Sequence, residues 1–236
     1  ATGSVWRLVA VGSTPDATQR YDVRTFPHLS RIEDMKVLLT GALGRLGSVV
    51  SQHLLDAGFE VRATDTRMDG QAPIKVLPVN LLDTIACYPL VEGVDAIVHL
   101  ANHPSYHGRD AQRICNENVS MNMNVFQAAA EVGVKRIVFA STIQTMTGTR
   151  RLGHSAERSC HAYLPADGNT LPTPGNPYAL SKVFSERMLQ YFYDIHGVNP
   201  VSFRFPHVVP REHMEYVERS TEPHSNERLD ELFAFL

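Results

Sequence analysis

The segment KVLLTGALGRLGSVV, residues 36–50, places Gly41, Gly44 and Gly47 at intervals of three directly after an apolar run. Apolar residues then recur at helical spacing, which predicts a strand, a tight turn and a helix in that order. Such a turn needs one residue with unusual backbone angles, a second without a side chain so that a pyrophosphate can approach, and a third that lets helix and strand pack closely. The first N–H groups of the helix then face the phosphates. The segment therefore predicts a dinucleotide-binding turn.

Extended and helical patterns alternate from Met35 onward, which is typical of strand-helix units and a mostly parallel sheet. A long helical pattern covers residues 119–132, and Asn176 with Pro177 marks the N-cap and first position of a further helix. The fold class expected is α/β, a Rossmann-like doubly wound parallel sheet with a short or truncated C-terminal substrate region. Six strands are expected, at residues 37–40, 60–65, 74–79, 96–101, 136–141 and 201–205.

Composition is that of an ordinary globular protein, with 43% hydrophobic residues and a formal net charge of -3 among 236 residues. Neither a nucleic-acid partner nor a membrane is indicated, because no basic excess and no run of about 18 apolar residues is present. Three cysteines without C-x-x-C spacing fit a reducing compartment, so we expect a cytoplasmic protein.

Three regions are expected along the chain. Residues 1–34 form an N-terminal extension, either an extra strand and arm or an upstream addition, and show no recognisable chemistry. Residues 35–211 form the NAD-binding Rossmann domain, and residues 212–236 begin a C-terminal substrate region.

Asp65 ends the second expected strand, 18 residues after Gly47. A carboxylate in this position can accept hydrogen bonds from both ribose hydroxyls of NAD and would repel the 2′-phosphate of NADP. NAD is therefore favoured over NADP. Arg45 and Arg67 are the opposing signal, since either could pair with a 2′-phosphate.

Five motifs then occur in one order. They are TGALGRLG, VDAIVHLAN, ENVSMNMNVFQAAAEVGVKRIVFAST, NPYALSK and FRFPHVVPR, within residues 35–211. In these motifs the chain resembles the extended short-chain dehydrogenase/reductase family, in its NAD-dependent epimerase/dehydratase group.

YALSK carries the chemistry that this resemblance implies. Tyr178 and Lys182 are four residues apart, so they share one helical face. The resemblance assigns Tyr178 as general acid/base and Lys182 as modulator of the Tyr178 pKa and ligand of the nicotinamide ribose. A nearby ammonium, a helix N-terminus and an oxidised nicotinamide would all favour the phenolate. A third catalytic hydroxyl is expected from FAST; alignment favours Thr142, with Ser141 as the alternative.

The resemblance also implies the cofactor contacts. Asn118 matches an asparagine that supports the active-site backbone, and Asn80 stands where the family often has an aspartate near adenine. The residues expected to bind the cofactor are Gly41, Leu43, Gly44, Arg45, Leu46, Gly47, Asp65, Asn80, Leu81, Leu100, Ala101, Asn118, Tyr178, Lys182 and Phe205. The spacing of four between His99, His103 and His107 would align metal ligands only on a helix, and His99 lies in an expected strand. No metal site is therefore expected.

The function that the resemblance implies is that of an NAD-dependent epimerase/dehydratase-family oxidoreductase, which acts on a hydroxyl of a sugar or sugar derivative by hydride transfer to NAD with a Tyr/Lys/Thr catalytic set. His207, where the family usually has an asparagine followed by a glycine turn, weakens the expectation of a nucleotide-sugar and favours a smaller sugar acid. The alternatives are a simple NAD-dependent dehydrogenase of a sugar acid or other small hydroxy compound, and a non-catalytic dinucleotide-binding sensor. A small sugar-like substrate is the expected partner, and a homodimer is one expected assembly.

Overall fold

The glycine segment joins a strand to a helix. The computed structural model describes residues 35–70, 72–104, 110–146, 167–206 and 208. In it, β1 (Lys36–Thr40) leads through the turn into α1 (Arg45–Asp56). The remaining elements follow as β2 (Glu60–Asp65), β3 (Val76–Pro78), α2 (Thr84–Val91), β4 (Ala96–His99), α3 (Ala111–Val132), β5 (Arg136–Thr142), the 3-10 helix η3 (Ile143–Thr145), α5 (Pro177–His196) and β6 (Asn199–Phe205).

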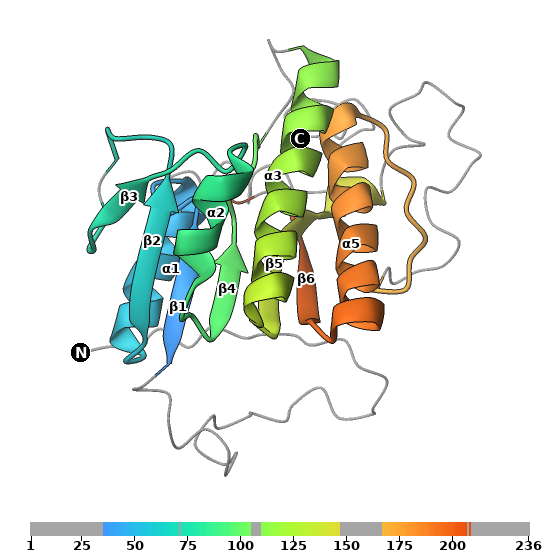
Figure 1. The fold of residues 1–236 in the computed structure, drawn as a ribbon. Coiled ribbons are helices and arrows are strands. Elements are labelled where there is room, and N and C mark those ends of the chain that lie inside the picture. The colour runs from blue at the N-terminus through green and yellow to red at the C-terminus, as the bar shows by residue number, and fades with distance from the viewer. Residues whose placement is uncertain (1–34, 71, 105–109, 147–166, 207, 209–236) are drawn as a thin grey trace, which may run out of the picture.

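The strands of the described chain form one parallel sheet in the order β3-β2-β1-β4-β5-β6 (Figure 1). The chain first moves outward from β1 to β3 and then crosses back to β4. The order therefore reverses between β1 and β4, and ligands of such sheets bind in the crevice at the carboxyl ends of the strands at this point. The expected Rossmann-like doubly wound sheet is confirmed.

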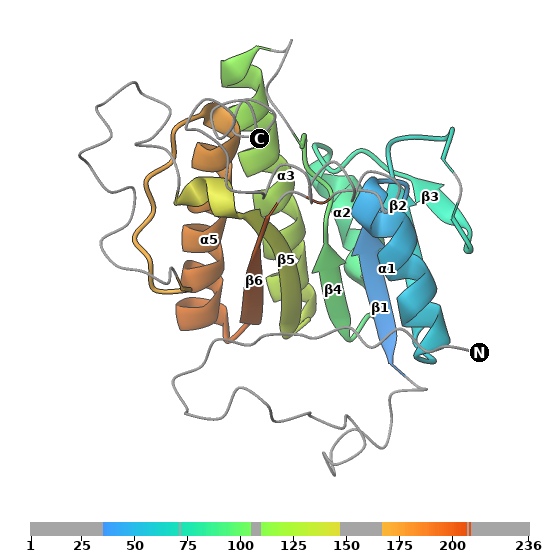
Figure 2. The ribbon, with the colours of Figure 1, turned by 180° about the vertical axis from the view of Figure 1, so that it is seen from behind.

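Helices cover both faces of the sheet. Figure 1 shows α2, α3 and α5 in front of it, and Figure 2 shows α1 on the opposite face. The larger core lies under α2, α3 and α5, where Phe126 makes edge contacts with Phe139 and Phe192 at centroid distances of 5.7 and 6.1 Å. All three rings are fully buried, and each such burial contributes roughly 1.5–3 kcal/mol to folding. A smaller core, around Leu39 and Ala63, lies under α1.

Two helices that supply site residues start at side-chain caps. The Asp110 carboxylate accepts hydrogen bonds from the N–H groups of Gln112 and Arg113 at the start of α3. At the start of α5 the Asn176 side chain accepts from the N–H of Ala179 at 2.8 Å, with Pro177 in the first turn. The sequence prediction for the start of α5 is thus confirmed, because a cap satisfies N–H groups that the helix itself leaves unpaired.

The structure differs from the expected elements at several points, and α3 begins at Ala111, before the expected start of its helical pattern at residue 119. β3 and β4 are shorter than the expected strands at 74–79 and 96–101, and in the second case the N–H groups of Leu100 and Ala101 turn to the Thr40 hydroxyl. α2 is an addition: it is apolar around most of its surface and contains Pro89, so no helical periodicity marks it. Its visible signal is the N-cap Asp83.

The expected regions 1–34 and 212–236, and the boundary at 211, lie outside the described residues. Of the helices that the structure does describe, none is long and apolar enough to cross a membrane.

Candidate active site

The glycine turn is built so that two positions exclude a side chain. Gly41 has φ of 70°, and a Cβ there would lie 2.8 Å from the backbone nitrogen of Ala101. A Cβ on Gly47 would overlap the carbonyl oxygen of Gly41. Gly44 is the N-cap of α1 and offers no side chain to the first-turn N–H groups, and no acidic residue lies in that turn. This helix N-terminus is therefore suited to an anion such as a pyrophosphate.

Asp65 at the end of β2 holds the same turn. One carboxylate oxygen accepts from the N–H of Leu43 at 2.9 Å, and the other accepts from the N–H of Arg67 at 3.0 Å. Each oxygen keeps capacity for a second donor. The Arg67 side chain pairs with Asp69 at 3.2 Å, and Arg45 is exposed. The carboxylate thus faces the turn, while both arginines lie at the exposed surface.

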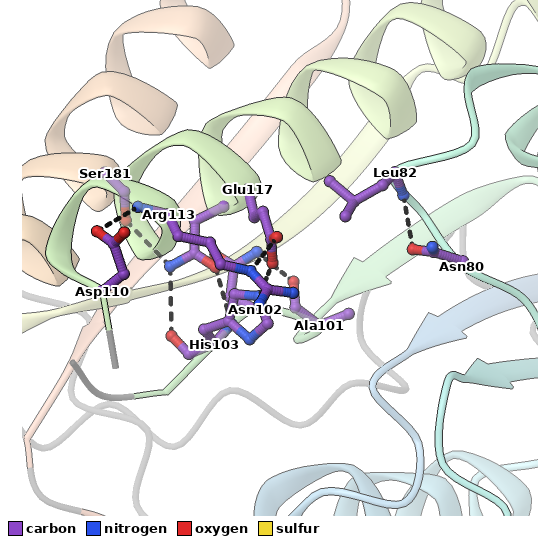
Figure 3. A network of polar contacts seen from close by, with 10 residues as sticks. Asn80, Leu82, Ala101, Asn102, His103, Asp110, Arg113, Glu117 and Ser181 are labelled. Atoms are coloured by element: carbon purple, nitrogen blue, oxygen red, sulfur yellow. Dashed lines mark hydrogen bonds and ion pairs between the residues drawn. The ribbon is translucent and has the colours of Figure 1, made fainter. Parts of the chain in front are cut away.

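Three further residues expected at the cofactor have other contacts in the structure. The Asn80 side chain accepts from the N–H of Leu82 at 3.1 Å and is exposed (Figure 3). The Leu81 side chain is buried in the larger core. Phe205 ends β6, opposite Thr142 in the sheet, with its ring 5.7 Å from that of Phe203. Leu100 and Ala101 lie beneath the glycine turn and are partly buried.

Tyr178 and Thr142 come together at the carboxyl end of β5, where the Thr142 hydroxyl lies near enough to the Tyr178 hydroxyl to lower its pKa. The start of α5, which carries Tyr178, is attached to the segment after β5 by a 2.8 Å bond from Asn176 Nδ2 to Gln144 Oε1. The Thr142 hydroxyl also accepts from the Gln144 N–H at 3.2 Å. The alignment-favoured Thr142 is therefore the hydroxyl beside the tyrosine.

Ser141 faces a different group. Its hydroxyl donates to Glu186 Oε1 at 2.5 Å, and Glu186 forms a 2.8 Å ion pair with Arg204 of β6. Arg204 also donates to the carbonyl oxygen of Thr170 at 3.0 Å. Ser141 thus takes part in a contact set that ties α5 to β6, while Thr142 contacts Tyr178.

Burial raises the pKa of the Tyr178 hydroxyl above its ordinary value, and the hydrogen bond from Thr142 lowers it only in part. This direction is opposite to the expected stabilisation of a phenolate by Lys182. The Lys182 ammonium lies 5.7 Å from the centre of the Tyr178 ring and is bound elsewhere, to Asn102 Oδ1 and to the Ala140 carbonyl oxygen, at 2.7 Å each.

Burial also lowers the pKa of the Lys182 ammonium to about 7, against a smaller opposing effect of the Glu186 carboxylate. Lys182 is 2% exposed. Both members of the Tyr178–Lys182 pair are therefore shifted toward their neutral forms by loss of water, as groups in active sites commonly are.

The Asn118 side chain binds the backbone of His103, shortly after β4, and makes no recorded hydrogen bond to Lys182. It accepts from the N–H of His103 at 2.8 Å and donates to the His103 carbonyl oxygen at 3.3 Å and to Ser181 at 3.2 Å. His103 pairs with Glu117 at 2.6 Å, and Glu117 with Arg113 at 2.5 Å (Figure 3). His103, shortly after β4, is thereby bound to α3, and Asn118 links α3 to Ser181 of α5.

The histidines that suggested a metal site have protein partners. His99 is fully buried between Thr40 and Asn122, and His103 pairs with Glu117, while His107 lies outside the described residues. Among the residues that the structure describes, no three His, Cys, Asp or Glu side chains gather as metal ligands would.

Comparison with known proteins places this site in a family. The model of the NAD-dependent epimerase/dehydratase family matches residues 37–226. The chain belongs to this family.

Relatives in the NAD-dependent epimerase/dehydratase family include sugar dehydrogenases. The chain is 32% identical over 181 residues to a uronate dehydrogenase of Pseudomonas putida, covering 75% of this chain and 62% of that protein. It is 30% identical over 183 residues to an NAD-dependent glucose-6-phosphate dehydrogenase of Haloferax volcanii, covering 72% and 68%. A short-chain dehydrogenase/reductase superfamily protein of Agrobacterium tumefaciens, solved with bound NAD, superposes with a TM-score of 0.62 at 28% identity, covering 72% of this chain and 48% of that one. The chain thus spans less than two thirds of the first and third of these relatives.

The sequence predictions missed three residues around the site. Asn102 and Asn122 bind each other and, through Asn102, the Lys182 ammonium, and Glu186 lies four residues after Lys182. The signal available for Asn122 and Glu186 was their i+4 spacing from Asn118 and Lys182, which places each pair on one helical face. Asn102 ends the motif VDAIVHLAN, but nothing local indicated its contact with Lys182, which is 80 residues away.

Proposed function

We propose that this member of the NAD-dependent epimerase/dehydratase family is an NAD-dependent dehydrogenase that oxidises a hydroxyl of a sugar or sugar acid. Tyr178 acts as the acid/base, Thr142 holds the reacting oxygen, and Lys182 supports Tyr178 and binds the nicotinamide ribose. The observation that carries the proposal is the position of the Tyr178 ring, with Thr142 near its hydroxyl and the buried Lys182 nitrogen 5.7 Å from the ring centre. Tyr178 and Thr142 lie at the carboxyl end of a sheet whose first turn is suited to a pyrophosphate.

The residues present fit NAD. Gly41, Gly44 and Gly47 leave room for a pyrophosphate at the start of α1, and the Asp65 carboxylate has capacity for ribose hydroxyls. The other residues expected to bind the cofactor are Leu43, Arg45 and Leu46 in the turn, Asn80 near adenine, and Leu81, Leu100, Ala101, Asn118 and Phe205. Leu81 would contribute through its backbone, since its side chain is in the core.

The chain's own residues handle the proton. When bound, NAD supplies the acceptor for the hydride that leaves the substrate carbon. The hydroxyl of Thr142 orients the substrate oxygen, and the substrate proton passes to the oxygen of Tyr178. Because burial raises the pKa of Tyr178, this oxygen needs a positive charge nearby to act as a base at neutral pH, and Lys182 is the cation on the same helical face.

A sugar or sugar acid is the substrate class that the relatives favour. The names of the relatives in Pseudomonas putida and Haloferax volcanii specify a uronate and a sugar phosphate. An L-arabinose 1-dehydrogenase of Haloferax volcanii is a further relative, 28% identical over 176 residues. The homodimer stays a prediction.

The test is an assay of purified protein for NADH formation from added NAD across uronates, aldoses and sugar phosphates. Turnover with one of these classes supports the proposal. Tight NAD binding without turnover on any of them would contradict it and favour the sensor alternative. Cofactor that stays bound through purification, with isomerised sugar and no net NADH, would instead indicate an epimerase.

Asp65→Asn should weaken NAD binding while leaving NADP binding unchanged or improved. The amide oxygen can still accept from the Leu43 N–H, but the negative charge that binds ribose hydroxyls and repels a 2′-phosphate is gone. The loss for NAD should be on the order of 1.5–3 kcal/mol, the range for a hydrogen bond to a charged group. Calorimetric titration with both cofactors measures it, and equal losses for both would remove Asp65 from this role.

Thr142→Val should lower turnover by about 10- to 100-fold with NAD binding intact, because the substrate oxygen and Tyr178 lose a hydrogen-bonding partner of about 1.5–3 kcal/mol. Ser141→Ala is the matched comparison: it removes a hydroxyl from the adjacent position, bound to Glu186 instead. Steady-state rates of NADH formation separate the two. A larger loss for Ser141→Ala would exchange the roles of these residues.

A further inference from the structure

The Lys182 ammonium is held by two acceptors from different strands. Its nitrogen donates to the Asn102 side-chain oxygen after β4 and to the Ala140 carbonyl oxygen of β5, at 2.7 Å each. The Phe139 ring centre lies 4.6 Å away. A buried cation is costly unless acceptors replace its water, so both contacts bear directly on whether the nitrogen stays charged.

The Asn102 amide can point only one way. Its nitrogen donates to the Ala101 carbonyl oxygen and, at 2.7 Å, to Asn122 Oδ1. Its oxygen accepts from Lys182 and from Asn122 Nδ2 at 3.2 Å. Turning the amide over would set its N–H groups against an ammonium and another N–H, and its oxygen against two acceptors.

Asn122 is fixed in turn by two buried groups. Its oxygen is 2.8 Å from His99 Nε2, and its nitrogen donates to the Ser185 hydroxyl at 2.6 Å. Because an amide oxygen only accepts, Nε2 carries the proton, and Nδ1 accepts from the Thr40 hydroxyl at 2.7 Å. Burial lowers the pKa of His99 to about 4, so this ring is neutral at physiological pH. The Thr40 oxygen also accepts from the N–H groups of Leu100 and Ala101 beneath the glycine turn.

We infer that Asn102 is a positioning residue: its side-chain oxygen holds the Lys182 nitrogen in place and favours its charged form, and Asn122 keeps that oxygen facing it. The role of Lys182 at the cofactor rests on the proposed function, whereas the hydrogen bond from its ammonium to Asn102 does not depend on that function. Hydrogen bonds connect Thr40, at the end of β1, through His99, Asn122 and Asn102 to Lys182.

Several titratable groups surround this ammonium in the described chain. Tyr178 and Glu186 lie on its own helix, α5, and His99 faces it from β4. From β6, Arg204 reaches Glu186 and neutralises part of its charge. In the hydrogen bonds recorded here, β5 and α3 contribute only neutral groups, the Ala140 carbonyl and Asn122. None of these changes in a variant at position 102, so a shift in Lys182 titration reports on Asn102.

Two substitutions should move the Lys182 titration in opposite directions. Asn102→Ala removes an acceptor of the charged form, so the midpoint should fall by about one pH unit. Asn102→Asp places a carboxylate at the same distance, so the midpoint should rise by one to three pH units, as for an opposite charge within hydrogen-bonding range. If Asn102 served only in packing, the two substitutions would not shift the midpoint of the Lys182 titration in opposite directions.

The measurement is a pH titration of the full chain labelled with ¹³C at lysine Cε, followed by NMR. The Lys182 signal is assigned by its loss in Lys182→Met. Asn124→Ala is the matched control, since this partly buried amide on α3 makes its recorded hydrogen bonds to Leu81, Leu82 and Thr84 rather than to Lys182. Circular dichroism verifies that each variant is folded; if Asn102→Asp is not, Asn102→Ala still decides.

A fall of the midpoint in Asn102→Ala with no change in Asn124→Ala supports the inference, whether or not the protein turns over any substrate. An unchanged midpoint in folded Asn102→Ala, or equal shifts in both variants, overturns it. Turnover assays of the same proteins answer a separate question: a complete absence of NADH formation in wild type contradicts the proposed function while leaving the NMR result valid.

Discussion

Tyr178→Phe should lower turnover by about 10²- to 10⁴-fold, or more, while the fold and NAD affinity stay close to wild type. The change removes one oxygen from a partly buried side chain whose described polar partner is Thr142. The ring can still pack on α5, so little stability depends on the hydroxyl. What is lost is the only group in this proposal that accepts the substrate proton.

Steady-state NADH formation, thermal unfolding and NAD titration measure the three quantities in Tyr178→Phe. Tyr193→Phe is the matched control, because it removes the same oxygen from the same helix at a residue that is 53% exposed. Near-wild-type turnover in Tyr178→Phe would refute the mechanism, and the family relationship would then describe ancestry rather than chemistry.

Lys182→Met should reduce both turnover and NAD affinity, because one ammonium is proposed to serve the phenolate and the nicotinamide ribose. The expected loss in turnover is comparable to that of the tyrosine variant, about 10²-fold or more. The fold should persist, since replacing a buried cation by an apolar side chain of similar length is often neutral or stabilising.

Lys182→Met should also change how stability depends on pH. With the pKa of Lys182 lowered by burial to about 7 from an ordinary 10.5, the unfolded chain binds a proton that the folded chain does not between these values. Wild-type stability therefore rises with pH across this window relative to the variant, by roughly 2 kcal/mol from about pH 7 to 9.

Urea unfolding at these two pH values measures that difference. Lys135→Met is the control, because this exposed lysine also donates to a carbonyl oxygen, that of His196, far from Tyr178 in the sequence. A parallel pH dependence in wild type and Lys182→Met would mean that the buried nitrogen titrates normally. Unchanged NAD affinity in Lys182→Met would remove it from the ribose.

Local sequence was sufficient for the elements with strong signals. The glycine turn, the strand ending at Asp65 and the N-cap at Asn176 were predicted in place, because each depends on neighbours within a few residues. α2 was missed for the same reason: with apolar residues around most of its surface and a proline inside, its helix is stabilised by packing against α3 and carries no local period.

The candidate site residues also divide into those that local spacing indicates and those whose surroundings depend on tertiary packing. Tyr178 and Lys182 share a helical face by their spacing alone. The different surroundings of Ser141 and Thr142 depend on the position of α5, which sets Glu186 against one hydroxyl and Tyr178 near the other. Leu81 was expected at the cofactor from its place in a motif, and the packing of α2 and α3 puts its side chain in the core.

The sequence by itself determined the order of the six strands along the chain, the turn that excludes side chains and the helical face shared by the tyrosine and the lysine, because these depend on backbone sterics and short periodicities. Only the tertiary structure decided the electrostatics of the site. The acceptors of Lys182 come from Asn102 and Ala140, 80 and 42 residues earlier, and the burial that shifts its pKa is a property of the assembled layers. Contacts over such separations and the loss of water around a charge arise when the chain is packed, so no local stretch of sequence contains them.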